Sequence, residues 1–101
     1  MIVVVFRNRF VEGIDREKFG RLDDEMWEIV SKMDGFISSR SYTAEDGERL
    51  TIVEFENEEA LEAWRNNESH QAAQKAGREE FYEYYSSHVC KEVRRSEFVR
   101  R

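Results

Sequence analysis

The chain has 101 residues, 40% hydrophobic and 38% charged, with a formal net charge of −6 and one cysteine. This composition predicts one globular domain with a heavily charged surface, and it argues against a nucleic-acid partner, an internal disulfide and a metal site. The longest apolar run, residues 2–6, is far shorter than the ~20 residues that cross a membrane and lacks the features of a signal peptide, so we expect a cytoplasmic protein with no membrane partner.

The first two predicted elements are a strand and a helix. Residues 2–10, IVVVFRNRF, are β-branched and aromatic, which favours a strand. Residues 15–34 change to helical spacing, and their apolar residues form one stripe that faces a core. The stripe consists of Phe19, Leu22, Met26, Ile29, Val30 and Met33. Asp15 is the expected N-cap, and Gly35 can adopt the left-handed conformation that ends a helix.

Two strands and a turn are predicted in the middle of the chain. Residues 36–44 and 49–55 contain the β-branched and aromatic types that strands favour. Asp46 and Gly47 lie between them and favour a tight turn, because glycine tolerates the positive φ that such turns require. We therefore expect these strands to pair as a hairpin.

The remainder contains two helical segments and a strand. Asn57 is expected to cap a short helix, EEALEAWR, and Asn67 to cap a second helix from Glu68 to about Tyr85. The stretch SHVCKEV then forms the last strand. The element order is βαββαβ with the second helical region split in two. The predicted fold class is therefore α+β, with a ferredoxin-like plan and a four-stranded antiparallel sheet.

The first strand is apolar on both faces, with Ile2, Val4 and Phe6 on one and Val3 and Val5 on the other. The strand at residues 49–55 has the same property. An antiparallel sheet with one face in water normally alternates apolar and polar residues, and the helices of this plan cover one face only. The second apolar face needs a partner, and the simplest partner is another copy of the sheet. We predict a homodimer whose two sheets pack face to face.

Three strings in chain order resemble the antibiotic biosynthesis monooxygenase family: VVVFRNRF, MDGFISSRSYTAEDGERLTIVEFENEEALEAW and SHQAAQKAGREEFYEYYSSHVCKEVR. We assign residues 1–98 to one domain of this type and residues 99–101 to a C-terminal tail. The resemblance implies a ferredoxin-like dimeric α+β barrel, in agreement with the argument from two apolar faces. It also implies chemistry without flavin or a dedicated metal. One group of members oxidises aromatic phenols with O₂, a second binds and degrades haem, and many have no established substrate.

Asn8 and Trp64 are the first two candidate site residues. Asn8 lies on the apolar face of the first strand, where an amide with unmet hydrogen bonds costs ~1–3 kcal/mol, so it needs a protein partner or a ligand. In the family, an asparagine at this place hydrogen-bonds substrate or oxygen. A tryptophan at the place of Trp64 lines the family's cavity. The purely structural alternatives are an amide that holds a neighbouring backbone group and an ordinary core anchor.

His70 is the third candidate catalytic residue. From the first turn of its helix it can act as a base, bind haem iron or serve only in the capping turn. In the haem-degrading members, the ligand histidine falls about one helical turn further from the tryptophan. Gln74 or Lys75 stands there in this chain. No cofactor is therefore expected, and haem is kept as an alternative.

The candidate substrate-binding residues are Met26, Met33, Gly77, Phe81 and Tyr84. The two methionines lie on the buried stripe of the first helix, and the other three lie on the helix face shared with His70. Ordinary core packing explains the same spacing. On the last strand, His88 and Cys90 share a face without a third ligand, so we expect a small buried thiol and no metal there.

The leading functional hypothesis is a cofactor-independent monooxygenase that acts on a small phenol, quinol or other aromatic molecule with O₂. Asn8 and His70 would supply the polar contacts in a cavity walled by Trp64, Phe81 and the first helix. A haem-binding or haem-degrading protein is one alternative. A non-catalytic dimeric module that binds a small ligand is the other.

Overall fold

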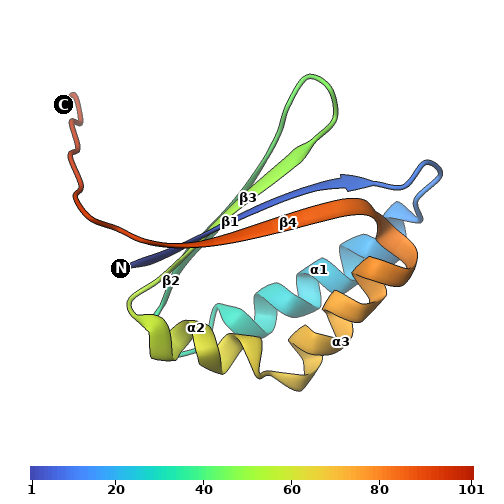
Figure 1. Cartoon of the computed structure of the whole chain (residues 1–101), viewed down its shortest axis with the longest axis horizontal. Coiled ribbons are helices and arrows are strands. Elements are labelled where there is room, and N and C mark those ends of the chain that lie inside the picture. The colour runs from blue at the N-terminus through green and yellow to red at the C-terminus, as the bar shows by residue number, and fades with distance from the viewer.

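Four strands form one antiparallel sheet, and three helices cover one of its faces (Figure 1). The computed structural model describes residues 1–101. The strands are β1 (Ile2–Phe10), β2 (Phe36–Thr43), β3 (Arg49–Phe55) and β4 (Tyr82–Lys91), in the order β2-β3-β1-β4. The helices are α1 (Arg16–Val30), α2 (Glu58–Arg65) and α3 (Glu68–Ala76), and one π-helical turn, η1 (Gly77–Phe81), follows α3. The predicted ferredoxin-like α+β fold is therefore confirmed.

The predicted caps are present at all three helix starts. The side chains of Asp15, Asn57 and Asn67 each accept a hydrogen bond from the backbone N–H three residues later, at 3.0, 2.9 and 3.0 Å. Each bond satisfies a donor that the first helical turn leaves unpaired. The β2–β3 hairpin also forms as predicted, and Gly47 in its loop has a φ of 91°.

Two predicted helix ends are wrong. Helix α1 ends at Val30 with Ser31 as its C-cap, rather than at residue 34. Helix α3 ends at Ala76, and β4 begins at Tyr82, so the predicted helix to Tyr85 is several residues too long. Pairing between distant strands explains the earlier start of β4. The start of β4 pairs with the end of β1, which would otherwise be left without a neighbour on that side.

Strand register assigns the side chains of β1 to two faces. Asn8 is opposite Arg49 of β3 and Tyr85 of β4, and these three residues share the helix-covered face. Val5 is opposite Ile52 and belongs to the other face, which no element covers (Figure 1). The two apolar faces predicted for β1 and β3 are therefore present.

The main core lies between α2 and one end of the sheet. Its buried members are Ile2, Val30, Phe55, Ala60, Leu61 and Trp64. Met26 and Met33 pack against this cluster from α1 and the turn after it. None of the helices is long and apolar enough to span a membrane.

Both the backbone conformation and the packing at position 35 require glycine. We therefore expect Gly35→Ala to destabilise the chain by about 2–4 kcal/mol. Its φ of 82° disfavours any residue with a Cβ, and an added Cβ would lie 2.6 Å from the Cβ of Ala60. Gly20→Ala is the matched control, because no atom lies within 4 Å of its added Cβ and α1 should gain about 1 kcal/mol. Urea unfolding followed by circular dichroism measures both. Equal stability of the two variants would contradict the close approach of Gly35 to α2.

Candidate functional site

Asn8 is fully buried, at 0% exposure, and neither its Nδ2 nor its Oδ1 has a hydrogen-bond partner. The alternation of β1 directs it to the helix-covered face between Phe6 and Phe10. A buried amide without partners costs ~1–3 kcal/mol. The structural alternative, in which Asn8 ties down a backbone group, is therefore not what the structure shows.

Aromatic residues flank Asn8 on its face of the sheet. The Tyr82 ring centre lies 5.7 Å from that of Phe6 and 6.0 Å from that of Phe10, the two residues that flank Asn8 on its strand. Phe19 of α1 completes the group, 4.8 Å from Phe10. The neighbours of Asn8 along its strand on this face are therefore aromatic rings packed against one another.

Charged and polar groups adjoin the aromatic ring cluster. The guanidinium carbon of Arg49 lies 4.7 Å from the Phe10 ring centre. Burial raises the pKa of Tyr82 to about 12, so its hydroxyl stays protonated and can donate a hydrogen bond at neutral pH. Burial also raises the pKa of Asp23, and the positive charge of Arg49 opposes that shift.

Gly77 is buried because the Tyr82 ring occupies the space that a side chain would need. An added Cβ would lie 2.7 Å from Cε2 of Tyr82. The close approach of this ring accounts for a glycine at position 77. Phe81 is also buried and meets Phe19 edge to face at 5.5 Å.

Trp64 and His70 come together at the other candidate location. Their rings stack with centres 4.1 Å apart and an interplanar angle of 21°. The Nδ1 of His70 lies 3.1 Å from the Trp64 carbonyl oxygen. A carbonyl only accepts hydrogen bonds, so Nδ1 carries the proton and Nε2 of the neutral ring keeps a free lone pair. His70 is thus oriented as a base, but it makes no hydrogen bond with Asn8.

Burial lowers the pKa of His70 below the ordinary 6.5, and the bond to the Trp64 carbonyl opposes this shift only in part. As the pH falls through 6.5, the unfolded chain therefore takes up a proton before the folded chain does. We expect the free energy of unfolding to decrease below pH 6.5, by at most about 1.4 kcal/mol per pH unit.

His70→Gln should flatten this part of the stability profile, measured by urea unfolding between pH 5 and 7.5. An unchanged slope in His70→Gln would contradict the burial of the neutral imidazole.

Tyr84, a predicted site residue, lies on the uncovered face of the sheet. It belongs to β4 opposite Arg9, and its hydroxyl donates to Glu48 at 2.5 Å. Glu48 also accepts two bonds from Arg7, at 2.9 and 3.1 Å. The expectation that Tyr84 shares a helix face with His70 is wrong, because β4 begins earlier than the helical spacing predicted.

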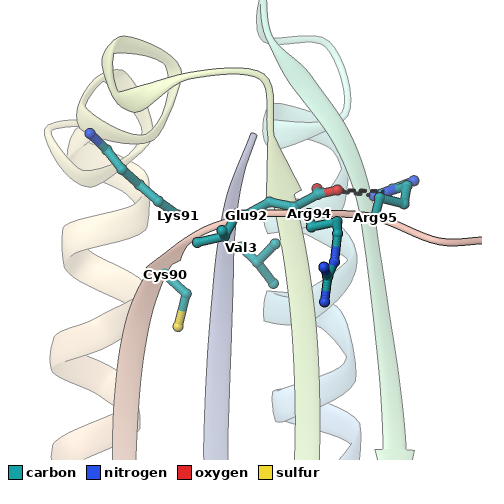
Figure 2. A pocket seen from close by; sticks show the side chains of 7 residues that line it. Val3, Cys90, Lys91, Glu92, Arg94 and Arg95 are labelled. Carbon is teal, nitrogen blue, oxygen red and sulfur yellow. Dashed lines mark hydrogen bonds and ion pairs between the residues drawn. The ribbon is translucent and has the colours of Figure 1, made fainter.

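Cys90 is exposed, so the expectation of a buried thiol is also wrong. It shares the uncovered face with His88 and Val3, as the register shows. Val3 and Cys90 border a hollow of about 790 Å³ beside the segment that follows β4, where Glu92 and Arg95 form an ion pair (Figure 2). No group of three or more histidine, cysteine, aspartate or glutamate side chains is arranged to hold a metal ion.

A second hollow, of about 650 Å³, adjoins the turn between β1 and α1 and is bordered by Phe10 and Arg16. Neither hollow is lined by Asn8, Trp64 or His70. A cavity walled by Trp64, Phe81 and α1 stays a prediction.

The sequence analysis missed Arg49, Asp23 and Tyr82. Arg49 could have been found from the sequence, because it lies an even number of positions from Val53 and Phe55 on the same strand. Alternation therefore places its charge on their inward face. Tyr82 was missed because it was assigned to a helix. Asp23 resembles the other acidic residues of α1 and carried no such signal.

Residues 1–76 match the family model "Antibiotic biosynthesis monooxygenase". The chain belongs to this family. The match includes Asn8, Trp64 and His70, whereas Phe81 and Tyr84 lie outside it.

The chain is similar in sequence to the uncharacterized protein YqjZ of Bacillus subtilis (strain 168). It is 30% identical over 73 residues, which make up 72% of this chain and 64% of that protein. The chain therefore spans less than two-thirds of this relative's length.

Two solved structures share the fold of this chain. Rv0793 from Mycobacterium tuberculosis has a TM-score of 0.80 at 18% identity, over 95% of this chain and 98% of that one. SnoaB, a cofactor-independent oxygenase from Streptomyces nogalater, has a TM-score of 0.75 at 10% identity, over 93% and 94%. At these identities the likeness shows the fold alone.

Proposed function

We propose that the protein is a cofactor-independent monooxygenase that oxidises a small phenol, quinol or related aromatic molecule with O₂. The observation that carries this proposal is the fully buried Asn8 amide, which has no hydrogen-bond partner within the protein and lies between Phe6 and Phe10 on its strand. Membership of the monooxygenase family supports it, as does the structural likeness to SnoaB, a cofactor-independent oxygenase. A ligand that hydrogen-bonds the amide would remove its ~1–3 kcal/mol cost.

In this reaction, the phenol loses a proton and its electron-rich anion reacts with O₂. A phenol and O₂ then give a quinone and one water, which balances without an added reductant. The Asn8 amide would hold the substrate oxygen, and the free Nε2 of His70 is the candidate base. Low dielectric around the rings strengthens the hydrogen bonds to developing charge. Trp64 would hold the imidazole in place through the stacked contact and its carbonyl.

We also propose that the working form is a homodimer in which the uncovered sheet faces pack together. Val3, Val5, Leu50 and Ile52 form the apolar centre of that face. No helix lies over it (Figure 1). Apolar side chains on an uncovered face favour association with a second copy.

The test of the function is oxygen uptake by the purified chain with a panel of phenols and hydroquinones, repeated after chelator treatment. We expect uptake that chelation leaves unchanged and that Asn8→Ala reduces at least tenfold. No uptake with any member of the panel, in a chain that still binds these compounds, would instead support the non-catalytic ligand-binding module.

Haem binding is a second candidate, favoured by the tautomer of His70. The hydrogen bond from Nδ1 to the Trp64 carbonyl leaves Nε2 as the atom that could ligate iron, an arrangement typical of histidine ligands. When bound, haem would supply the iron that activates oxygen. A haem titration with a Soret shift that disappears in His70→Ala would support this candidate, and an unshifted spectrum would exclude it.

A further inference from the structure

Arg49 lies opposite Asn8 in the sheet and has no hydrogen-bond or ion-pair partner. It begins β3 directly opposite Asn8 in the sheet register, on the helix-covered face. Its guanidinium carbon is 4.7 Å from the Phe10 ring centre and 5.2 Å from that of Phe19. Its side chain makes no hydrogen bond and no ion pair, although a guanidinium has five N–H donors.

Arg49 is partly buried, whereas the other arginines that form no ion pair are exposed. Arg7 donates two hydrogen bonds to Glu48, and Arg95 forms ion pairs with three carboxylates. Arg49 is partly buried among aromatic rings, where an unpaired charge is more costly than it is in water. Asp23, whose charge acts on Arg49, forms no ion pair with it, and burial raises the pKa of its carboxyl group.

Three neighbouring groups thus present unused polar atoms to one small region. Arg49 offers cationic donors, Asn8 offers a donor and an acceptor, and Tyr82 offers a hydroxyl that makes no side-chain hydrogen bond. The surrounding rings of Phe10 and Phe19 are apolar and flat. This combination matches a planar aromatic ligand that carries an anionic oxygen.

We propose that Arg49 is the anion-recognition residue of this site, and that the ligand is an aromatic acid with an ionised carboxylate or phenolate oxygen. A planar guanidinium binds such oxygens through two parallel hydrogen bonds, and aromatic side chains stack on the ligand ring. Asn8 then hydrogen-bonds a second ligand oxygen. The inference rests on the proposed function only in treating this ligand as the substrate, because the binding itself needs no reaction.

The test compares binding of 4-hydroxybenzoate and its uncharged methyl ester to the full chain, by calorimetry under nitrogen. We expect the acid to bind at least tenfold more tightly than the ester. Arg49→Gln should weaken the acid at least tenfold and leave the ester within twofold, because a charge-assisted hydrogen bond contributes about 10- to 100-fold in affinity. Arg49→Lys should recover part of the loss. In NMR spectra, the acid should shift the side-chain signals of Arg49 and Asn8.

Arg16→Gln is the matched control. Arg16 also lies over the Phe10 ring, at 5.5 Å, but it is exposed at the start of α1, so its replacement should leave the affinity unchanged. 4-Nitrophenol, titrated above and below its own pKa, distinguishes the two anions. If Arg49→Gln lowers the affinity of the nitrophenolate alone, the site binds phenolates. If it lowers the affinity of the hydroxybenzoate alone, the site binds carboxylates.

Two results would overturn the proposal: unchanged affinity of both the hydroxybenzoate and the nitrophenolate in Arg49→Gln, or no binding of any probe at millimolar concentration. These outcomes are separable from failure of the proposed function. If binding depends on Arg49 but no oxygen is taken up, the anion site is supported and the monooxygenase proposal is refuted. Oxygen uptake by a chain whose affinity for both anions is unchanged in Arg49→Gln removes the anion site and leaves the monooxygenase.

Discussion

Asn8→Leu is expected to stabilise the unliganded protein by about 1–3 kcal/mol and to abolish its oxygen uptake. The substitution removes a fully buried amide whose two polar atoms have no partner, and it replaces them with apolar atoms of similar volume among aromatic rings. For a domain of about 100 residues, each kcal/mol raises the Tm by roughly 4–8 °C. Calorimetry measures the first effect, and an oxygen electrode measures the second.

The control for this substitution is Asn67→Ala. The Asn67 side chain accepts a hydrogen bond from the backbone N–H of His70 at 3.0 Å, so its loss should destabilise the chain by about 1 kcal/mol. The two asparagine substitutions therefore have opposite expected signs. If Asn8→Leu lowers the Tm, the amide is satisfied within the protein and the physical basis for a ligand at Asn8 is lost.

Val5→Arg is expected to convert a homodimer into a monomer. Val5 occupies the centre of the uncovered face, between Ile52 of β3 and His88 of β4. Face-to-face packing would bury the introduced charge without a partner, at a cost of about 3–5 kcal/mol, which raises the dimer dissociation constant more than 100-fold. Light scattering over a range of micromolar concentrations measures the change in mass.

Val89→Arg is the matched control for the dimer. Val89 belongs to the same sheet, is 54% exposed and pairs with Val4, so it lies on the other face. The same substitution there should leave the mass unchanged. A wild-type chain that stays monomeric at these concentrations, or a Val5→Arg chain that stays dimeric, would refute the face-to-face arrangement.

The proposed monooxygenase would thus hold functional groups at some cost to stability. An unpaired amide and an unpaired guanidinium lie side by side on the helix-covered face. Such groups are rare in folded proteins, because burial without a partner is unfavourable. The stabilising effect expected of Asn8→Leu and the binding loss expected of Arg49→Gln both follow from the same juxtaposition.

Local sequence patterns were sufficient to predict the element order, the three helix caps and the hairpin. Asp15, Asn57 and Asn67 cap their helices through contacts within three residues, and Gly47 supplies a local turn conformation. The family also followed from the chain's strings, since the family model matches residues 1–76. The place of Asn8 on an apolar face followed from strand alternation alone.

Only the tertiary structure decided where β4 begins and which groups surround Asn8. The aromatic stretch that contains Tyr82 and Tyr84 fits helical spacing as well as a strand, and pairing with the end of β1 resolves this ambiguity in favour of the strand. That pairing places Tyr82 opposite Phe10 on the helix-covered face and Tyr84 opposite Arg9 on the other face. Arg49 comes to lie beside Asn8 through contacts between residues 41 positions apart, which local patterns do not encode. The choice between competing local conformations depends on long-range contacts, and those contacts exist only in the folded chain.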